Sequence, residues 1–247
     1  MHEVTRIRRE ARHRAASVSS VVQLTPVMRR IVFSSEEFAD FESASPDDHV
    51  KIAFPQQGGP DSKPAKRDFT PRLFDKNSIT IDFALHDAGP ATQWANQAKV
   101  GDSLMIGGPR GSNVVPDDFD WYIFIGDETA LPAIGRWVEQ LRMGVPVATY
   151  IMTEGADDRQ MFKTASSYRS TWLVRSNASD EATAIKSELA GFVAPPGDGF
   201  VWIGAEAAVA RSLRDYFLKD RQHPKAWVKA SGYWQRGVAD ADVKIED

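Results

Sequence analysis

The first half of the chain consists of short runs in which apolar residues alternate with polar ones. Ile79, Ile81, Phe83 and Leu85 occupy every second position of one such run, a spacing typical of a strand with one buried face. Turn residues separate the runs, and only residues 91–99 have the pattern of a helix. We expect strands over residues 17–25, 27–35, 49–55, 67–74, 78–86 and 102–108. Short strands of this kind favour a small antiparallel barrel.

From about residue 118 the pattern changes to buried strands that alternate with amphipathic helices. The run "WYIFIGDE" is apolar up to its acidic end, and "LPAIGRWVEQL" follows it with helical spacing. This alternation predicts a doubly wound parallel sheet. The expected strands cover residues 121–128, 145–153, 170–176 and 200–206, with helices over 131–141, 180–192 and 207–220. We therefore expect two domains, residues 1–117 and 118–247.

The composition excludes several kinds of chemistry. The 247 residues include no cysteine, which rules out disulfides, thiolate metal sites and cysteine nucleophiles. The five histidines lack the spacing of metal ligands. No run is long and apolar enough for a membrane helix, and a net charge of −4 does not suit a nucleic-acid-binding protein. We expect no metal site, and a monomer in the cytoplasm. The arginines of the first fourteen residues predict a solvated arm, with local anion binding as the alternative.

The stretch "RDFTPR", residues 67–72, combines charge, an aromatic ring and a hydroxyl group. Arg67 can bind a phosphate through two parallel hydrogen bonds. Phe69 can lie against an isoalloxazine ring, and Thr70 can contact the N5 edge of that ring. The alternative is an edge strand in which Arg67 and Arg72 face solvent around a core Phe69.

A second stretch, "HDAGPATQWA" at residues 86–95, leads from a turn into a helix. A helix start near residues 91–92 has free amides and the positive end of the helix dipole, and it is therefore a suitable pyrophosphate site. Gly89 would let the backbone approach the anion closely. The alternatives are an N-cap by Thr92, a core position for Trp94, and a His86 that ends its strand without touching a flavin.

These stretches belong to a set of segments that resembles the siderophore-interacting protein family, the flavin-containing ferric-siderophore reductases of the ferredoxin-reductase superfamily. The matching segments, in chain order, are "DDHVKIAFP", "RDFTPR", "HDAGPATQWA", "GDSLMIGGPRGS", "IGDETALPAI", "VWIGAEA" with "RSLRDYF", and "SGYWQRG". The resemblance implies FAD on the barrel, held by Arg67, Phe69, Thr70, His86 and the Gly89–Thr92 loop. It also implies a second domain that faces NADPH or NADH.

Two positions depart from the family pattern. Phe69 stands where the family usually has Tyr, so one hydroxyl is lost while a ring for stacking remains. Residues 204–206 read Gly-Ala-Glu where Ala-Gly-Glu is usual, which would shift the backbone approach to a nucleotide.

The candidate residues fall into three groups. The cofactor-binding candidates are Arg67, Asp68, Phe69, Thr70, Phe83, His86, Gly89, Ala91, Thr92, Trp94, Asp127, Thr129, Ala130, Tyr233 and Trp234. The substrate-binding candidates are Lys51 and Arg110, whose charge would attract an anionic ferric chelate; two solvated surface charges are the alternative. The candidates for a 2′-phosphate of NADPH are Arg142, Arg175, Arg211 and Arg214.

Two of these assignments depend on where strands end. Asp127 and Thr129 follow the first parallel strand, and open sheets bind ligands at that edge; the alternative is an ordinary turn capped by Asp127. Tyr233 and Trp234 would shield the flavin on the nicotinamide side, or they belong to an ordinary strand. No GxGxxG or Walker A sequence is present.

The expected reaction is reduction of Fe(III) in a siderophore complex, with electrons passing from NAD(P)H through FAD to iron. No catalytic side chain is expected, because the chemistry belongs to the cofactor. Reduced ferredoxin is an alternative electron donor. The alternative functions are a general flavin or ferredoxin-linked reductase and a non-catalytic carrier of ferric chelates.

Overall fold

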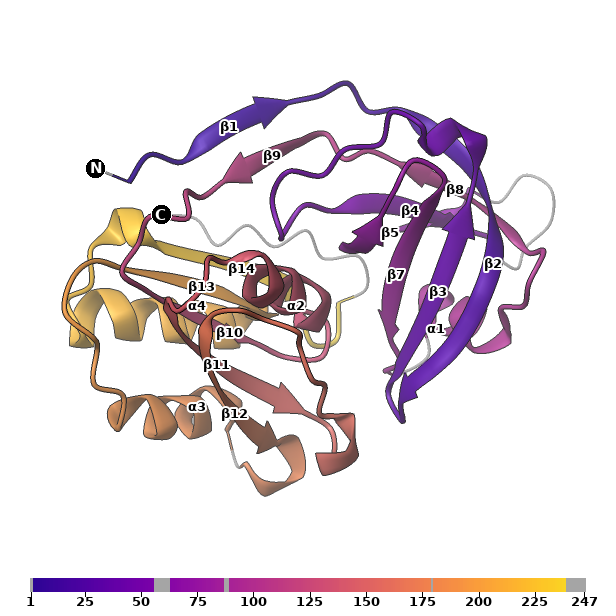
Figure 1. Ribbon diagram of the computed structural model, residues 1–247. Coiled ribbons are helices and arrows are strands. Elements are labelled where there is room, and N and C mark those ends of the chain that lie inside the picture. Colours follow the sequence, from indigo (N-terminus) through magenta and orange to yellow (C-terminus); the bar gives the residue numbers. More distant parts are fainter. Residues whose placement is uncertain (1, 56–62, 87–88, 179, 239–247) are drawn as a thin grey trace. The chain divides into compact units, whose positions relative to one another are not determined.

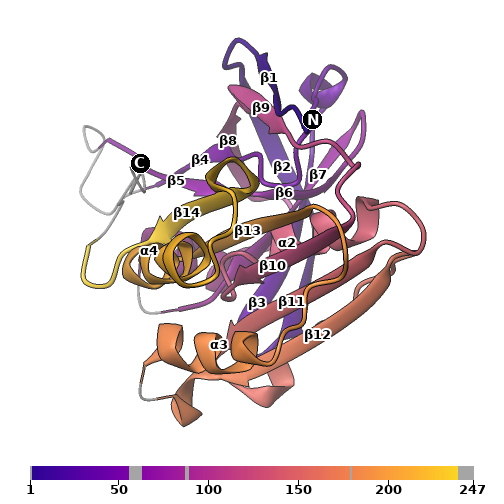
Figure 2. The ribbon, with the colours of Figure 1, turned by 90° about the vertical axis from the view of Figure 1, so that its left-hand side faces the viewer.

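The computed structural model describes residues 2–55, 63–86, 89–178 and 180–238 (Figures 1 and 2). The chain divides into two compact units, Met1–Pro116 and Asp117–Asp247. Each unit has its own sheet and its own hydrophobic core.

The first unit is antiparallel. Its described strands form a seven-stranded sheet in the order β5-β4-β8-β2-β3-β7-β6 and a two-stranded sheet, β1-β9. The elements are β1 (Thr5–Arg8), β2 (His13–Thr25), β3 (Met28–Ser34), η1 (Glu36–Phe38), β4 (Val50–Phe54), β5 (Ala65–Phe69), β6 (Pro71–Phe74), β7 (Ser78–Ala84), α1 (Pro90–Gln97), β8 (Ser103–Gly107) and β9 (Gly111–Val114). The predicted antiparallel barrel is thus confirmed as a curled antiparallel sheet.

The two edge strands of the large sheet are consecutive in the sequence and meet at Thr70. The run at residues 67–74, predicted as one strand, is divided there into β5 and β6, so that prediction was wrong. Pro71 explains the position of the break, because it lacks an N–H for a central ladder and is compatible with the first residue of an edge strand. A single residue, Thr70, therefore connects the two edge strands of the curled sheet.

The core of this unit follows the predicted alternation. Ile79, Ile81 and Phe83 of β7 are at most 1% exposed. Across the ladder, Phe33 pairs with Ile79 and Ile31 with Ile81, and cross-strand neighbours of this kind share a face. The alternating residues of β7 and β3 thus fill the inside of the curl.

The segment with the N-terminal arginines is paired and is not a free arm, which corrects the prediction, but Arg6, Arg8 and Arg12 are exposed as expected. β1 pairs with β9 over Thr5–Arg8 and Gly111–Val114. Arg14 is buried: its guanidinium donates to the carbonyls of Glu37 and Gly108 and forms an ion pair with Asp40 at 3.0 Å. Burial is the main cause of a lowered pKa of Arg14. Arg14 is therefore part of the fold, because its donors satisfy backbone carbonyls of the first unit.

The second unit contains a five-stranded sheet in which every described pair is parallel, in the order β12-β11-β10-β13-β14. The elements are β10 (Trp121–Gly126), α2 (Leu131–Gln140), β11 (Pro146–Thr153), η2 (Ala156–Asp158), β12 (Ser167–Val174), η3 (Arg175–Asn177), α3 (Glu181–Ala190), β13 (Gly199–Glu206), α4 (Ala207–Asp215), η4 (a π-helical turn, Tyr216–Asp220), η5 (Lys225–Trp227) and β14 (Val228–Trp234).

Helices cover both faces of this sheet, so the predicted doubly wound arrangement is confirmed. On one face Ile123 and Ile203 belong to the same core cluster as Ile185 of α3 and Leu213 of α4. On the other face Phe124 stacks on Trp137 of α2 with ring centroids 5.3 Å apart. Strands that are covered on both sides read as continuous apolar runs, which is the pattern of "WYIFIG".

Candidate functional site

Alternating residues of β5 separate the "RDFTPR" side chains onto two faces. Arg67 pairs with Ile52 and Phe69 with Val50, and both partners are fully buried, so Arg67 and Phe69 lie on the inner face. Asp68 pairs with Lys51 on the outer face, where Lys51 Nζ lies 2.8 Å from Asp68 Oδ2. The structure therefore groups Arg67 with Phe69 and separates the Asp68 side chain from both.

Phe69 belongs to an aromatic cluster at the end of the curled sheet. Its ring centroid lies 4.6 Å from that of Phe83 and 5.9 Å from that of Phe54. Trp94 of α1 joins the cluster, 5.9 Å from Phe83 and 5.8 Å from Phe54. Phe83 is only 1% exposed, so it supports Phe69 from within and is not itself a surface for a flavin ring. Phe69 and Trp94 are half-buried and keep accessible ring surface.

The start of α1 has the features of an anion site. Gly89 is the N-cap and Pro90 the first helical residue, and no side chain caps the helix. The first-turn amides of Ala91 and Thr92 therefore have no side-chain acceptor, and helix starts of this kind suit phosphate. Thr92 is buried in the first turn and is not the N-cap, so that alternative was wrong. Gly89 has an extended backbone with φ −95°, which does not itself require glycine.

These residues fit a flavin dinucleotide. The fit rests on the uncapped amides at the start of α1, the next element after β7, and on the half-buried ring of Phe69, which packs on Phe83 of β7. Arg67 shares the face of Phe69. Thr70 is buried at the junction of β5 and β6, and His86 is exposed two residues after the end of β7. Asp87 and Ala88 of the same motif lie outside the described residues.

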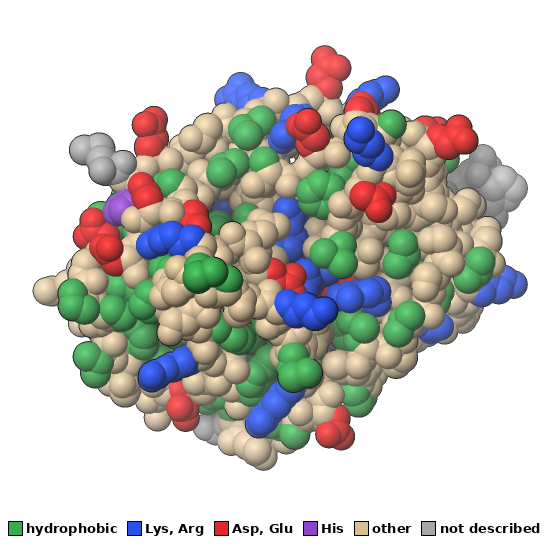
Figure 3. Space-filling view, viewed as in Figure 1, with side chains coloured by type: hydrophobic (Ala, Val, Ile, Leu, Met, Phe, Trp, Pro, Cys, Tyr) green, Lys and Arg blue, Asp and Glu red, His purple; other side chains and the backbone are tan. Residues whose placement is uncertain are grey.

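Of the two substrate-binding candidates in the first unit, Lys51 lies on β4 and Arg110 lies in the loop between β8 and β9. Lys51 pairs with Gly107 of β8, three residues before Arg110. Arg110 is exposed, and none of the carboxylates that the structure describes pairs with it. The charge of Lys51, in contrast, is partly neutralised by Asp68. Charges of both signs occupy the visible face in Figure 3.

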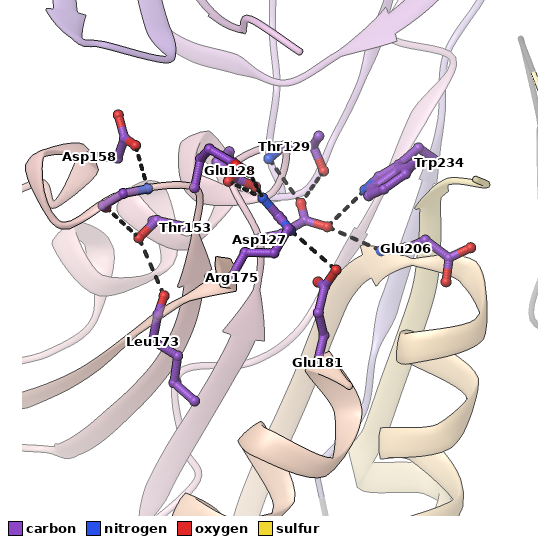
Figure 4. Close-up of polar contacts among 12 residues, drawn as sticks. Asp127, Glu128, Thr129, Thr153, Asp158, Leu173, Arg175, Glu181, Glu206 and Trp234 are labelled. Atoms are coloured by element: carbon purple, nitrogen blue, oxygen red, sulfur yellow. Dashed lines mark hydrogen bonds and ion pairs between the residues drawn. The ribbon is translucent and has the colours of Figure 1, made fainter. Parts of the chain in front are cut away.

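In the second unit, Asp127 is at the carboxyl end of β10 and is 1% exposed (Figure 4). Its Oδ1 accepts hydrogen bonds from the amide and the hydroxyl of Thr129, at 2.9 Å and 2.5 Å. Its Oδ2 accepts from the amide of Glu206 and from the indole of Trp234, at 3.1 Å and 2.8 Å. Burial raises the pKa of Asp127, and these hydrogen bonds oppose the rise.

Asp127 therefore organises the edge of the sheet from within. It forms a turn with Thr129 but does not cap α2, whose N-cap is the fully buried Ala130. Its carboxylate oxygens accept four hydrogen bonds, all from within the unit, so little acceptor capacity is left for a ligand. Thr129 is partly exposed and is the residue of this loop that a ligand can reach.

Tyr233 and Trp234 have different surroundings, although both belong to β14. Tyr233 packs edge-to-face on Trp202 with centroids 5.9 Å apart. Trp234 directs its indole N–H to Asp127. The segment is thus a strand, as the alternative assumed, and only Trp234 reaches the carboxyl edge of β10.

Arg175 lies at the centre of an ion-pair network that the sequence did not indicate. Its guanidinium contacts both oxygens of Glu128, at 2.6 Å and 2.8 Å, and also Glu154 at 2.8 Å and Glu181 at 3.1 Å. The hydrogen bonds that Arg175 donates to Glu128 are the main cause of the raised pKa of Arg175. The available signal was that Glu128, Glu154 and Arg175 each lie at or next to the carboxyl end of a predicted strand.

Two of the arginines expected at a 2′-phosphate are therefore already engaged. Arg175 is held by three carboxylates, and Arg142 binds Asp117 and the carbonyl of Phe119. Arg211 is exposed on α4, and Arg214 is half-buried in its last turn.

The described residues contain neither a membrane-spanning helix nor a cluster of metal ligands. No helix in them is long and apolar enough to cross a membrane. No group of three or more His, Asp or Glu side chains in them is arranged to hold a metal ion.

An antiparallel curled sheet with an uncapped helix start, joined to a doubly wound parallel sheet, defines a class of two-unit flavin-type reductase folds. The chain belongs to the siderophore-interacting protein family within this class. The siderophore-interacting FAD-binding domain profile matches residues 17–62 and 58–113, and the siderophore-interacting protein profile matches residues 119–237.

Individual relatives span nearly the whole chain. An NADPH-dependent ferric-chelate reductase of Escherichia coli (strain K12) is 33% identical over 93% of this chain and 95% of its own length. The crystal structure of a siderophore utilization protein from T. fusca superposes with a TM-score of 0.89, at 32% identity over 97% of this chain and 99% of that one. The siderophore-interacting protein SipS from Aeromonas hydrophila has a TM-score of 0.82 and 29% identity, over 93% and 94% of the two chains.

Proposed function

We propose that this protein is a flavin-dependent oxidoreductase that transfers electrons from NAD(P)H to Fe(III) in a siderophore complex and thereby releases Fe(II). Its family membership and the named ferric-chelate reductase among its relatives support this activity. The observation that carries the proposal is the combination of Arg67, Phe69 and the uncapped start of α1 in a unit that matches a siderophore-interacting FAD-binding domain.

Each of these residues has a physical role in holding the cofactor. Arg67 would hold phosphate oxygens with its planar guanidinium. The amides of Ala91 and Thr92 would bind the pyrophosphate at the positive end of α1. Phe69, supported from behind by Phe83, would offer its ring to the isoalloxazine, and Thr70 would contact the ring edge. Bound FAD supplies the conversion of a two-electron hydride into single-electron transfers to iron.

The substrate class that fits is an anionic ferric chelate. Arg110 is an exposed cation, and Lys51 contributes the part of its charge that Asp68 does not offset. Such charges raise the local concentration of an anion by long-range attraction and do not require a pocket complementary to its shape. Electron transfer then needs proximity alone, which agrees with the lack of an acid–base pair among the candidate residues.

The electron donor that fits is a nicotinamide nucleotide bound at the carboxyl ends of the parallel strands. The E. coli relative, named as NADPH-dependent, supports NADPH over NADH. Reduced ferredoxin is the competing donor. We propose that the protein acts as a monomer in the cytoplasm, where NAD(P)H is available; light scattering and cell fractionation test these two points.

Anaerobic half-reactions test the function. The purified protein should carry noncovalently bound FAD, which NADPH or NADH should bleach, and a ferric tris-catecholate should then restore the flavin absorbance as Fe(II) appears in a ferrozine trap. A protein that remains colourless with excess FAD would overturn the proposal. If reduced ferredoxin bleaches the flavin and neither nucleotide does, the electron donor is ferredoxin and not NAD(P)H. Faster reduction of free flavin than of any ferric chelate would identify a general flavin reductase.

A further inference from the structure

The parallel sheet has a topological switch point between β10 and β13. Successive strands leave β10 in opposite directions, to β11 and β12 on one side and to β13 and β14 on the other. Ligands of open α/β sheets bind in the crevice outside the carboxyl ends of the strands at such a point. The backbone is closely packed here, because a Cβ on Gly126 would lie 2.6 Å from the carbonyl oxygen of Gly204. A nucleotide bound at this point would therefore contact mainly the side chains around these two glycines.

A β-bulge places Trp234 at the switch point. Ala205 pairs with Gly232, but the next residue, Glu206, pairs with Trp234, so Tyr233 is the additional residue. Bulges redirect side chains and occur frequently beside active sites. Here the additional residue lets Tyr233 pack on Trp202 while the next side chain reaches the end of β10. Without the bulge, Trp234 would lie one position out of step with Glu206.

Asp127 fixes the indole in that position. The 2.8 Å hydrogen bond joins a fully buried carboxylate to a ring that remains half-exposed. The other three donors to the carboxylate come from Thr129 and Glu206, so its position is fixed both from the loop after β10 and from the end of β13 (Figure 4). A hydrogen bond to a charged acceptor is stronger than a neutral one. The exposed part of the ring is therefore held in one orientation.

We propose that Asp127 is a positioning residue for the donor nucleotide: it holds the Trp234 indole as one wall of the NAD(P)H crevice at the ends of β10 and β13. The inference rests on the proposed function, because it takes the donor to be NAD(P)H. Asp127 touches neither the nucleotide nor the flavin in this arrangement. It acts through Trp234, whose exposed ring gives the nucleotide a flat apolar surface that is already in place before binding. Such preorganisation improves affinity because less side-chain freedom is lost on binding.

The first variant is Trp234→Phe, which removes the indole N–H but keeps an aromatic ring and the three other contacts of Asp127. We expect KM for NADPH and NADH to rise about three- to tenfold while kcat stays within about twofold, the pattern of a lost binding contribution. The dissociation constant of NADP⁺ for the holoprotein, measured by calorimetry, should rise by the same factor. FAD content and the rate at which dithionite-reduced enzyme reduces a ferric chelate should not change.

The second variant is Asp127→Asn, which keeps the size of the side chain. An amide has one acceptor oxygen in place of two. Because N–H or O–H donors face both oxygens of Asp127, the NH₂ group of the Asn would point at donors on one side and lose those hydrogen bonds. We expect the same rise in KM or a larger one, and little further change when Trp234→Phe is added, because both variants break the same bond. Trp172→Phe on β12 is the matched control. Trp172 is half-buried in an edge strand, and its loss should leave KM and NADP⁺ affinity unchanged.

The outcomes separate the inference from the function on which it rests. Normal turnover of wild-type protein with an unchanged KM in Trp234→Phe would overturn the inference and leave the reductase function in place. A loss of FAD or of dithionite-driven activity in Trp234→Phe would also overturn it, because the indole would then support the fold. Wild-type protein that oxidises neither nucleotide would overturn the donor assignment and the inference together.

Discussion

Lys51 and Asp68 form an ion pair across β4 and β5, with Nζ and Oδ2 2.8 Å apart and both side chains about 40% exposed. A residue expected to bind substrate is thus paired with one expected to bind the cofactor. Arg110, on the same unit, has no such partner among the described carboxylates. The two cations therefore differ in the charge that they present to an anionic chelate.

We expect Arg110→Ala to raise KM for a ferric tris-catecholate more than Lys51→Ala does. None of the described carboxylates opposes the Arg110 charge, whereas an exposed ion pair such as Lys51–Asp68 has little net charge to attract an anion. The effect should be a few-fold for Arg110 and less than about twofold for Lys51, and both should shrink in 1 M salt, where the Debye length falls to about 3 Å. Steady-state kinetics at low and high salt measure this. Equal losses with a neutral ferric hydroxamate would show that the residues act on folding or on the flavin.

Asp68→Asn should change KM for the anionic chelate in the opposite direction. Removing the carboxylate frees Lys51, so KM for the anionic chelate should fall by up to about fivefold, the equivalent of roughly 1 kcal/mol. FAD content should stay constant, because the Asp68 side chain lies on the face opposite Arg67. Absorbance of the purified variant checks the flavin content. A loss of FAD would show that Asp68 contributes to cofactor binding, as the sequence predicted.

Arg67→Ala should weaken FAD binding about ten- to a hundredfold, since a charged hydrogen bond to phosphate contributes roughly 1.5–3 kcal/mol. Flavin fluorescence during titration of the apoprotein gives the dissociation constant. Lys66→Ala is the matched control, because Lys66 is exposed on the same strand and pairs with Ala53 on the outer face. Equal affinity in the two variants would place Arg67 on an ordinary edge strand.

Local patterns predicted the sheets because burial on one face or on both leaves a direct trace in the sequence. Ile79, Ile81 and Phe83 alternate with the polar but also buried Thr80 and Asp82, because only one face of β7 adds to the apolar core. The run "WYIFIG" is continuous because both faces of β10 are apolar and buried. The strand β1 was missed because "TRIR" contains one apolar residue and depends on pairing with residues about a hundred positions away.

The candidate sites show the same limit. The sequence identified Arg67, Phe69 and the start of α1, since each belongs to a short local motif. It identified Asp127 and Trp234 separately, but the bond between them spans 107 residues and depends on a bulge that no pattern revealed. Arg175 was assigned to a phosphate for a related reason: an arginine at a strand end looks free until the carboxylates at the neighbouring strand ends are placed.

Arg175→Ala should destabilise the second unit without changing nucleotide preference. Glu128 and Glu181 are about 90% buried, and loss of their shared cation should lower the free energy of unfolding by about 3 kcal/mol. The ratio of kcat/KM for NADPH to that for NADH should not change, because the guanidinium is already held by three carboxylates. Urea unfolding and the two kinetic constants measure these effects. A selective loss with NADPH would show that Arg175 binds the 2′-phosphate after all.

His223 should make the stability of the second unit depend on pH near neutrality. Its ring packs against Trp121 and Trp227, and its Nε2 donates to the Gly199 carbonyl at 2.9 Å. Burial lowers the pKa of His223 below 6.5, and the charge of Arg221 adds to this. Between the lowered pKa and 6.5, the folded state binds fewer protons than the unfolded state. Stability therefore rises with pH through this window and is lost as pH falls below 6.5, at no more than about 1.4 kcal/mol per pH unit.

His223→Gln keeps a donor for the Gly199 carbonyl and removes the titration. Its free energy of unfolding should therefore vary less with pH than that of wild type across this window. Trp121 and Trp227 lie against the ring, so tryptophan fluorescence during urea unfolding reports on the right unit. His49→Gln, at an exposed histidine of the first unit, is the matched control and should keep the wild-type slope. If His223→Gln keeps that slope too, the ring is protonated equally in the folded and unfolded states. Burial of the ring would then make no contribution to the pH dependence of the free energy of unfolding.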